Sequence, residues 1–526
     1  MFNQSTHKEK YILLAFFILN IFLKLSFFNI NLAEYTDGII QIIQHKLSIP
    51  SYWPPMYNWL TRAISTLGLS LEASAKIVSI ISSSLLIVPL YYLTRMLADN
   101  QQKPAIFAVL IYTLSPIHLR WSVRVMSDSL FSFFNFCAIY YLFLLFEYRT
   151  HTYYFLKYAL YTNIFLILAN LTRFQGLLLV PFFFYILYIV FYNFIKRIKN
   201  WDKISKIFKK KIIKYSPFLI ISFIPWIFYL PYLAEKIHLH LLQFHNREAH
   251  SILSTLANYF IYFDEFLGHI PYFFNYIVVG FAIIGFVKLD SRKIKIQIFK
   301  LFILYYLFSL LLLQSAFQSF QERYLLPFLP FVSTLSGIGI FLSLYELSPK
   351  TQPGIKYYQM RKSFFYPLYI FLIIIGIFTM TITTIGIMTY QSQTFASIKD
   401  VALFLKKCKT KGNIYSNEIY NNNLKTIKIS FWSGKKIKYF SPHNLPKFKK
   451  GDIICIHSIY AGKEYFPTIN RILKLYNVRT LYSTVRYRII PIFPDVMSLS
   501  IANQNPIWAT FRFKPQYFES IVLEVE

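Results

Sequence analysis

Cysteine is scarce in this chain of 526 residues, which contains only Cys137, Cys408 and Cys455. Three widely spaced cysteines give neither the disulfide framework of a small secreted domain nor the clustered ligands of a zinc site. Cys408 and Cys455 are candidates for one disulfide if their region lies outside the cytoplasm, and two free thiols are the favoured alternative. A fold held together by disulfides or by structural zinc is therefore excluded.

Charged residues are also few, and acidic residues especially so. Only 15% of the residues are charged and 56% are hydrophobic, with 23 acidic residues against 55 basic ones. This composition excludes an ordinary soluble protein. The 15 glycines are few for a membrane transporter built from glycine-interrupted half-helices, so a membrane protein of another kind is favoured.

Long apolar runs account for the hydrophobic composition. About eleven of them are long enough, or nearly long enough, to cross a bilayer, so the sequence predicts an α-helical polytopic membrane protein. The first run follows a short basic tail and has no small-residue cleavage site after it, which favours a retained span over a signal peptide. The predicted spans are 11–30, 74–93, 104–118, 128–146, 155–169, 176–195, 215–233, 272–287, 301–316, 324–345 and 364–388.

The loops between these runs fall into two sets. One set is basic, most clearly residues 196–214, and the positive-inside rule places it in the cytoplasm together with the N-terminus. The other set is poorer in cations and is expected on the extracytoplasmic side. Topology thus explains the net charge of +32, so membrane lipids are expected partners and nucleic acid is not. The cation-poor loops are 31–73, 119–127, 170–175, 234–271 and 317–323.

The stretch from residue 389 to residue 526 differs from the rest of the chain. Asn, Lys, Thr and Ser become more frequent, a helical pattern covers 396–407, and alternating strand patterns cover 453–456 and 480–487. We therefore predict a transmembrane domain over 1–388 and a small extracytoplasmic α/β domain over 389–526.

Two acidic residues follow the first predicted span, in the stretch Glu34-Tyr35-Thr36-Asp37-Gly38. Carboxylates at the mouth of a span are costly against lipid, so these two are expected to face a cavity or water. In a helix they would share one face, because they are three residues apart. Such a group can serve as a general base toward a hydroxyl, and a solvated loop carboxylate or a helix N-cap is an equally good interpretation of the residues alone.

An aromatic and proline-rich stretch, Trp53-Pro54-Pro55-Met56-Tyr57, lies in the same loop. Each proline restricts its own φ and the residue before it, so the stretch fixes the direction of the backbone. We expect Trp53, Pro54, Pro55 and Tyr57 to position a substrate. The alternative is a turn within an interfacial aromatic belt.

Four arginines occur in the cation-poor loops, at Arg120, Arg124, Arg173 and Arg323. Arginine suits phosphate oxygens because its planar fork donates two parallel hydrogen bonds. Their convergence predicts an anion site such as a lipid phosphate, and separate contacts to lipid headgroups are the alternative. Asp128 either caps the following span or pairs with an arginine, and capping is favoured.

Histidines gather in the loop 234–271, with several acidic residues nearby. Their spacings are compatible with metal binding but form no fixed ligand pattern, so neither a metal nor another cofactor is predicted, and a divalent metal is left open without support. The histidines are His238, His240, His245, His250 and His269.

Taken in order, these stretches resemble the C-type membrane glycosyltransferases of the family 39 type. That family includes protein O-mannosyltransferases and the aminoarabinose transferases that modify lipid A. The matching stretches are 34–38, 54–57, 115–131, 172–178 and 323–327. Asp128 stands where the family usually has Glu, Phe174-Gln175 replaces the common Pro-Glu, and the adjacent Asp-Glu pair of some members is absent. Glu34 therefore stays a second candidate for the base.

The resemblance implies an inverting transferase with a polyprenyl-phosphate-linked sugar as donor, in a bacterial inner membrane. Its acceptor would be a protein, lipid A or a glycan on the extracytoplasmic side. Asp37 would be the general base, the four arginines would bind the donor phosphate, and Asp128, Glu322 and Tyr324 would help to position the substrates.

Two other classes of function stay open from the sequence. A transporter or flippase of lipid-linked sugars requires polar groups near the middle of the bilayer, whereas here they crowd one rim. A third interpretation makes 389–526 a receptor or assembly module anchored by the remainder of the chain.

Overall fold

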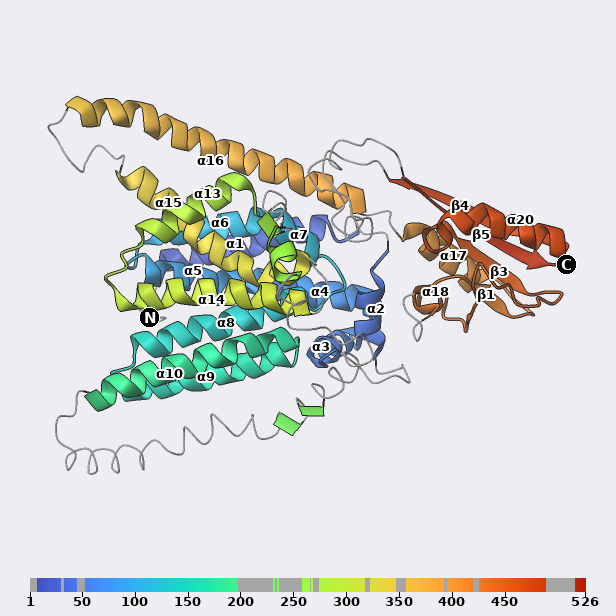
Figure 1. Cartoon of the computed structure of the whole chain (residues 1–526), viewed down its shortest axis with the longest axis horizontal. Coiled ribbons are helices and arrows are strands. Elements are labelled where there is room, and N and C mark those ends of the chain that lie inside the picture. The colour runs from blue at the N-terminus through green and yellow to red at the C-terminus, as the bar shows by residue number, and fades with distance from the viewer. Residues whose placement is uncertain are drawn as a thin grey trace.

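The computed structural model contains a helical bundle with a small α/β domain at one end (Figure 1). It describes residues 7–29, 33–44, 53–196, 230–231, 234–235, 258–264, 266–267, 274–316, 322–346, 356–391, 395–419, 425–488 and 516–526. The mixture of a mostly helical part and a small sheet is the fold class that the sequence predicts.

The bundle helices coincide with the predicted spans, except that 215–233 lies almost entirely outside the described residues. Within the described part, four helical stretches are long and apolar enough to cross a membrane, or five if a pair bent by 57° at Ser115 counts as one. The count of eleven spans stays a prediction. The helices are α1 (His7–Ser26), α4 (Leu71–Leu85), α5 (Ile87–Leu97), α6 (Gln102–Leu114), α8 (Asp128–Glu147), α9 (Thr152–Asn170), α10 (Leu179–Lys196), α13 (Tyr276–Lys288), α14 (Ile294–Ala316), α15 (Leu329–Glu346) and α16 (Lys356–Gln391).

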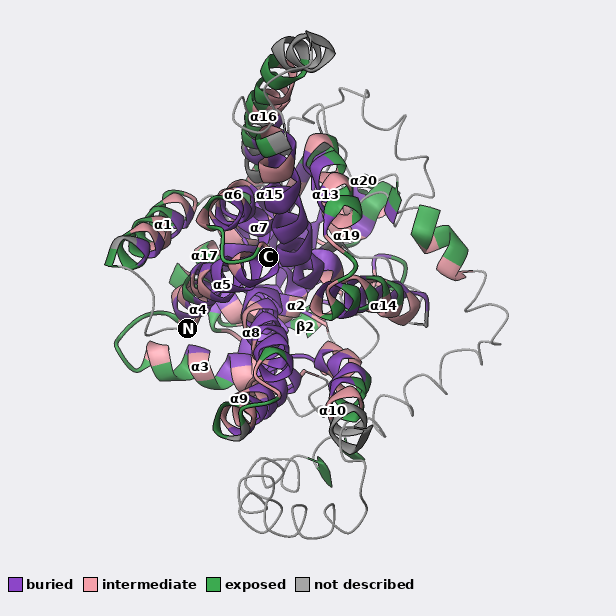
Figure 2. Ribbon diagram, turned by 90° about the vertical axis from the view of Figure 1, so that its left-hand side faces the viewer, coloured by how far each residue is buried: buried purple, intermediate pink, exposed green. Residues whose placement is uncertain are grey.

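The centre of the bundle is packed with aromatic side chains from α8, α14 and α15, including Phe136, Phe302 and Phe331. Figure 2 looks along the bundle and shows buried residues concentrated at its centre, with exposed faces on the outer helices α1 and α16. Those outer faces carry large apolar side chains such as Phe22 and Phe378. An apolar exterior of this kind suits contact with lipid rather than with water.

One end of the bundle collects those described loops that the sequence assigns to the cytoplasm, whereas the basic loop 196–214 lies almost entirely outside the described residues. Glu9, near the start of α1, pairs with Arg95 at 2.7 Å, and Lys293 pairs with Asp99 at 2.5 Å. The N-terminal region, the α5–α6 loop and the α13–α14 loop therefore meet, as expected for segments on one side of a membrane.

The other end of the bundle collects the cation-poor loops and adjoins the α/β domain. The described parts of these loops form short helices. They are α2 (Thr36–Ile43), α3 (Met56–Ser65), α7 (Pro116–Ser122), η3 (Phe174–Leu178) and η4 (Glu322–Phe328). Figure 1 shows α2 and α3 beside the α/β domain.

The α/β domain contains a five-stranded sheet in the order β2-β1-β3-β5-β4. Strand β1 is parallel to β2 and β3, whereas β5 is antiparallel to β3 and β4. The predicted helix 396–407 and the predicted strands near 453 and 480 are all present, and Cys408 and Cys455 are free thiols. The elements are α17 (Ala396–Lys407), β1 (Ile414–Ser416), α18 (Ile427–Ser433), β2 (Lys438–Tyr439), β3 (Ile453–His457), α19 (Ser458–Ala461), η5 (Gly462–Glu464), α20 (Tyr465–Leu475), β4 (Val478–Arg488) and β5 (Gln516–Val525).

The α/β domain docks on α2 through apolar side chains. Ala33 and Ile39 belong to the same buried cluster as Val401 of α17 and Ile429 and Trp432 of α18. Helix α2 is thus held between the bundle and the α/β domain. This position makes it the element around which the candidate site is built.

Candidate active site

Helix α2 is fixed against the loop that joins α7 to α8. Glu34 accepts a hydrogen bond from the Val125 backbone N–H at 3.2 Å, and Gln41 accepts one from the Ser127 N–H at 3.0 Å. Both acceptors satisfy backbone groups that no helix or strand pairs, so they set the position of α2 firmly. Asp37 lies in the first turn of the helix that these bonds hold.

Asp37 forms an ion pair with Arg323, with 2.5 Å between Oδ2 and Nη2. The Asp37 side chain keeps 17% of its surface exposed, whereas the side chains of Glu34 and Asp128 keep only 1% and 2%. Of these three acids, Asp37 is the one that a substrate can approach. It is also held in a fixed orientation by a buried cation, as a general base requires.

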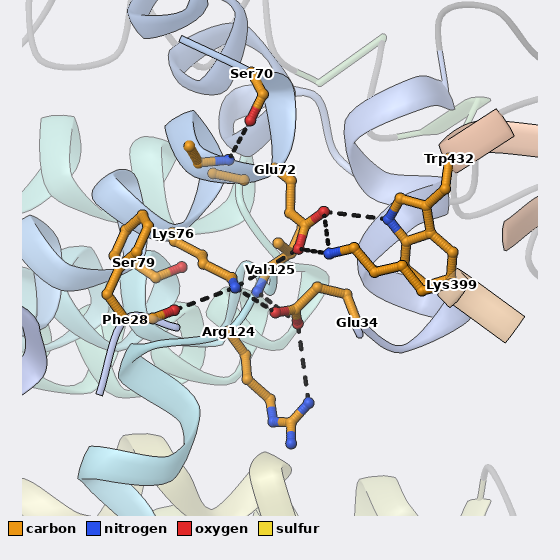
Figure 3. Close-up of polar contacts among 12 residues, drawn as sticks. Phe28, Glu34, Ser70, Glu72, Lys76, Ser79, Arg124, Val125, Lys399 and Trp432 are labelled. Carbon is orange, nitrogen blue, oxygen red and sulfur yellow. Dashed lines mark hydrogen bonds and ion pairs between the residues drawn. The ribbon is translucent and has the colours of Figure 1, made fainter. Parts of the chain in front are cut away.

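Glu34 faces a different set of partners, so the expectation that it shares a face with Asp37 is wrong. Glu34 precedes α2 and its carboxylate lies 3.1 Å from Lys76 Nζ and 3.9 Å from Arg124 Nη1 (Figure 3). Two cations and a backbone N–H therefore surround a fully buried carboxylate. Glu34 holds the loop and the arginine in place, and this arrangement leaves it poorly placed to receive a proton from a substrate.

Asp128 pairs with an arginine, which corrects the favoured expectation that it caps α8. Ser127 is the N-cap residue of α8. Asp128 Oδ2 accepts a hydrogen bond from Arg173 Nη2 at 2.7 Å, and Arg173 Nε donates to Ser127 Oγ at 3.1 Å. The Arg173 guanidinium thus binds two consecutive residues at the start of α8, which fixes this end of α8 against η3.

Replacing Arg173 by lysine should separate geometry from charge. A lysine keeps the positive charge but cannot reach Ser127 and Asp128 with one planar fork, so we expect Arg173→Lys to lower the free energy of unfolding by about 1–2 kcal/mol. Thermal unfolding in detergent measures this loss. Arg292→Lys, in the exposed pair with Asp290, is the matched control and should change nothing. Equal stability of all three proteins would contradict the structural role of Arg173.

The four predicted arginines lie around the α7–α8 loop. Arg173 and Arg323 both contact the Tyr324 ring, with Cζ 5.5 Å and 5.2 Å from its centroid. Arg124 lies 4.4 Å from the centroid of Tyr35, and Arg120 lies 5.0 Å from that of Trp121. The Tyr35 and Trp121 rings are themselves 6.0 Å apart. Arg173 and Arg323 therefore form one group, and Arg120 and Arg124 form a second group beside α2.

The aromatic and proline-rich stretch supports the site by joining helices α3 and α4. Pro55 is the N-cap residue of α3, and the Tyr57 hydroxyl donates to the Ala75 carbonyl at 3.0 Å and lies 3.0 Å from Ser79 Oγ. Tyr57 and Pro54 are buried, whereas Trp53 is partly exposed. Trp53, Pro55 and Met56 of this stretch have surface available to a substrate. Tyr57 is buried and acts through the helices that it joins.

Sequence reasoning missed two lysines that the fold brings to α2. Lys76 occurs at the start of an apolar run, four residues after Glu72, and this spacing was its only signal. Lys428 is one of many lysines in the α/β domain and has no such signal. Both side chains are buried.

Glu72 links the bundle to the α/β domain (Figure 3). Its carboxylate lies 2.9 Å from Lys399 Nζ of α17 and accepts from Trp432 Nε1 of α18 at 3.2 Å, while Lys76 lies 3.6 Å away. A continuous row of alternating charges thus runs from Arg124 through Glu34, Lys76 and Glu72 to Lys399.

Neutralising Glu72 should loosen the docked domain. Glu72→Gln keeps an acceptor for Trp432 but removes the partly exposed ion pair with Lys399, which is worth about 1 kcal/mol. Hydrogen exchange within α17 and α18 should therefore become about fivefold faster. Glu464→Gln, in the exposed pair with Arg471, is the control. Unchanged exchange in Glu72→Gln would show that apolar packing alone holds the domain.

The predicted histidine cluster lies outside the described residues, as does the side chain of Glu322. Among the residues that are described, no group of three or more His, Cys, Asp or Glu side chains could hold a metal ion.

Comparison with known proteins agrees with the architecture. The sequence profile of the family described as dolichyl-phosphate-mannose-protein mannosyltransferase matches residues 53–228. No curated protein sequence matches the chain. The candidate site residues between Trp53 and Arg173 lie within the matched stretch, whereas Glu34, Asp37 and Arg323 lie outside it.

Several solved structures have a similar fold, among them the following two. One is ArnT from Cupriavidus metallidurans bound to undecaprenyl phosphate, with a TM-score of 0.51 and 11% identity, covering 89% of this chain and 96% of that one. The other is the oligosaccharyltransferase AglB from Archaeoglobus fulgidus with an inhibitory peptide and a dolichol-phosphate. Its TM-score is 0.52 and its identity 10%, covering 90% of this chain and 73% of that one. The C-type glycosyltransferase fold is confirmed.

Proposed function

We propose that this chain, a membrane glycosyltransferase of the C-type fold, moves a sugar from a polyprenyl-phosphate-linked donor to an acceptor hydroxyl. The observation that carries this proposal is the partly exposed Asp37 carboxylate held by Arg323, with Arg173 next to that arginine. A base and two cations within one small region are what transfer from a phosphate leaving group requires. The undecaprenyl phosphate and dolichol-phosphate in the two similar structures support a lipid-linked donor.

In the proposed reaction, Asp37 takes the proton from the acceptor hydroxyl as its oxygen attacks the anomeric carbon of the sugar. The bond between that carbon and the phosphate oxygen breaks on the opposite face, so the anomeric configuration inverts. The electron pair leaves with the polyprenyl phosphate. The cations that compensate its charge are Arg173 and Arg323, supported by Arg120 and Arg124 beside α2.

The site lies at the end of the bundle opposite the basic loops, beside the α/β domain. We place this end, by the positive-inside rule, on the extracytoplasmic face of a bacterial inner membrane. Donors loaded in the cytoplasm would then be used outside. Trp53 and Tyr324 are partly exposed and can contact a sugar through their aromatic rings. The acceptor is a protein, a lipid or a glycan.

The test uses the purified full-length protein in detergent, a panel of polyprenyl-phosphate-linked sugars and a membrane extract as acceptor. Release of free polyprenyl phosphate from one donor, with the sugar recovered on an acceptor, supports the proposal and names the donor. Binding of a donor without release from any member of the panel would overturn it and favour a transporter or flippase of lipid-linked sugars.

A further inference from the structure

Lys428 of α18 carries a completely buried side chain. Its ammonium group has no hydrogen-bond partner among the described residues. Nζ lies 3.4 Å from the centroid of the Phe395 ring and 5.1 Å from that of the Tyr460 ring. Ring faces attract a cation but do not replace the hydrogen bonds that water supplied, so further compensation must come from nearby negative charge.

Two carboxylates supply that compensation, and they come from different domains. Glu418 of the α/β domain and Asp37 of α2 both favour the charged form of Lys428 and so raise its pKa. Glu418 is already bound to the start of α18, where its oxygens accept from the Lys428 and Ile429 backbone N–H groups at 2.8 and 2.9 Å. Asp37, by contrast, is the carboxylate that remains partly exposed.

The neighbours of Lys428 also contact the residues that flank Asp37. The Tyr460 phenol interacts with the Thr36 side chain, which favours its charged form. The Phe395 ring meets Tyr35 edge-on, with 5.8 Å between centroids. Tyr35, Thr36 and Asp37 are consecutive, so the surroundings of Lys428 are built directly onto the first turn of α2.

We infer that Lys428 is a positioning residue of the catalytic site, acting as a second cation for Asp37 beside Arg323. The α/β domain therefore completes the active site rather than merely covering it. This inference rests on the proposed function, because it assigns Lys428 a role toward the proposed base. Lys428 acts by keeping Asp37 ionised to lower pH, which extends the range in which Asp37 can accept a proton.

The charge state of Lys428 depends on its burial and on the ionisable groups near it, which are Glu418, Asp37, His457 and Tyr460. Burial lowers the pKa of Lys428 to about 8, against the opposing effect of Glu418 and Asp37. Burial and the Lys428 charge lower the pKa of His457 to about 3, so that this imidazole is neutral. Burial raises the pKa of Tyr460, whose phenol is therefore neutral as well. Lys428 is thus charged throughout the acid range.

The test compares the wild-type protein with Lys428→Met, which has a similar shape but no charge. The matched control is Lys436→Met, which removes an exposed lysine eight residues further along. The rate of sugar transfer is recorded against pH. We expect the acid limb of the Lys428→Met profile to move up by about one pH unit, so that the rate on that limb falls about tenfold. The rate on the neutral plateau should change less, and Lys436→Met should match the wild type.

A second measurement does not depend on turnover. Infrared spectra recorded against pH contain the carboxylic acid C=O band of Asp37, which Asp37→Asn identifies by its absence. In Lys428→Met this band should appear about one pH unit higher than in the wild type. Lys428→Arg keeps the charge and should leave both the band and the acid limb in place. If Lys428→Met fails to fold, the arginine variant still tests the proposal.

The outcomes separate the two proposals. The role of Lys428 would be overturned if neither the acid limb nor the infrared band shifts in Lys428→Met. It would also be overturned if Lys428→Arg shifts them by about one pH unit, as expected for loss of the charge. Both outcomes would leave the proposed transferase function intact. Absence of transfer by the wild type would overturn the proposed function, and the infrared titration would still decide whether Lys428 and Asp37 interact.

Discussion

The Asp37→Asn variant is expected to fold and to bind the donor, but to transfer sugar about 10²–10⁴-fold more slowly than the wild type. Asparagine has nearly the volume of aspartate, and its carbonyl oxygen can still accept the hydrogen bond from Arg323. It cannot take up a proton near neutral pH. The variant therefore removes the base and leaves the geometry of the site in place.

Single-turnover transfer and equilibrium donor binding, measured on the same preparation, check this expectation. The control is Asp290→Asn, which neutralises an exposed carboxylate in the α13–α14 loop at the opposite end of the bundle. Transfer close to the wild-type rate in Asp37→Asn would remove Asp37 from the mechanism. Glu34→Gln would then be the next variant to measure, since Glu34 is the second candidate for the base.

The Gly38→Ala variant is expected to lose at least about 100-fold in transfer, because the site moves by about 1 Å or more. A Cβ atom at position 38 would lie only 1.9 Å from the Val125 carbonyl oxygen and 3.0 Å from the carbonyl carbon. These are backbone atoms, so α2 itself must move away from the α7–α8 loop. That movement stretches the bonds of Glu34 and Gln41 to the loop and draws Asp37 away from Arg323.

Gly280→Ala is the control for Gly38→Ala. Gly280 lies within α13, and a Cβ there meets nothing within 4 Å. Alanine is favoured over glycine inside a helix by about 0.8–1.0 kcal/mol, so this variant should keep its activity and become slightly more stable. Transfer rates and thermal unfolding distinguish the two substitutions. Wild-type transfer by Gly38→Ala would mean that the contact between α2 and the loop does not set the geometry of the site.

Much of the architecture could be predicted because it depends on local patterns. Apolar run lengths give the bundle helices, and the distribution of lysine and arginine separates the two groups of loops that the structure brings to opposite ends. The helix 396–407 and the strands β3 and β4 follow from periodicity. The arginine motifs likewise identified Arg173 and Arg323, which the fold brings to a common contact with Tyr324.

The partners within the site could not be predicted, because they depend on distant parts of the chain. Asp37 pairs with a residue 286 positions away, and spacing alone suggested instead that it shared a face with Glu34. Asp128 appeared to be a cap because it begins a helix, yet the arginine at position 173 competes successfully for its carboxylate. Lys76 and Lys428 differ from exposed lysines only in their burial, which tertiary packing decides.

The position of β5 in the sheet sets an order of events during synthesis. This strand is the last of the five along the chain, yet it lies between β3 and β4 and pairs with both. Strand β4 cannot join the sheet until residues 516–525 have left the ribosome, by which time the bundle helices have long been made. Translation proceeds at about 5–20 residues per second, so for many seconds the nascent chain has its membrane helices but only an unfinished sheet. A ribosome that stalls in this interval would leave a membrane-inserted chain in which β4 lacks its partner strand β5.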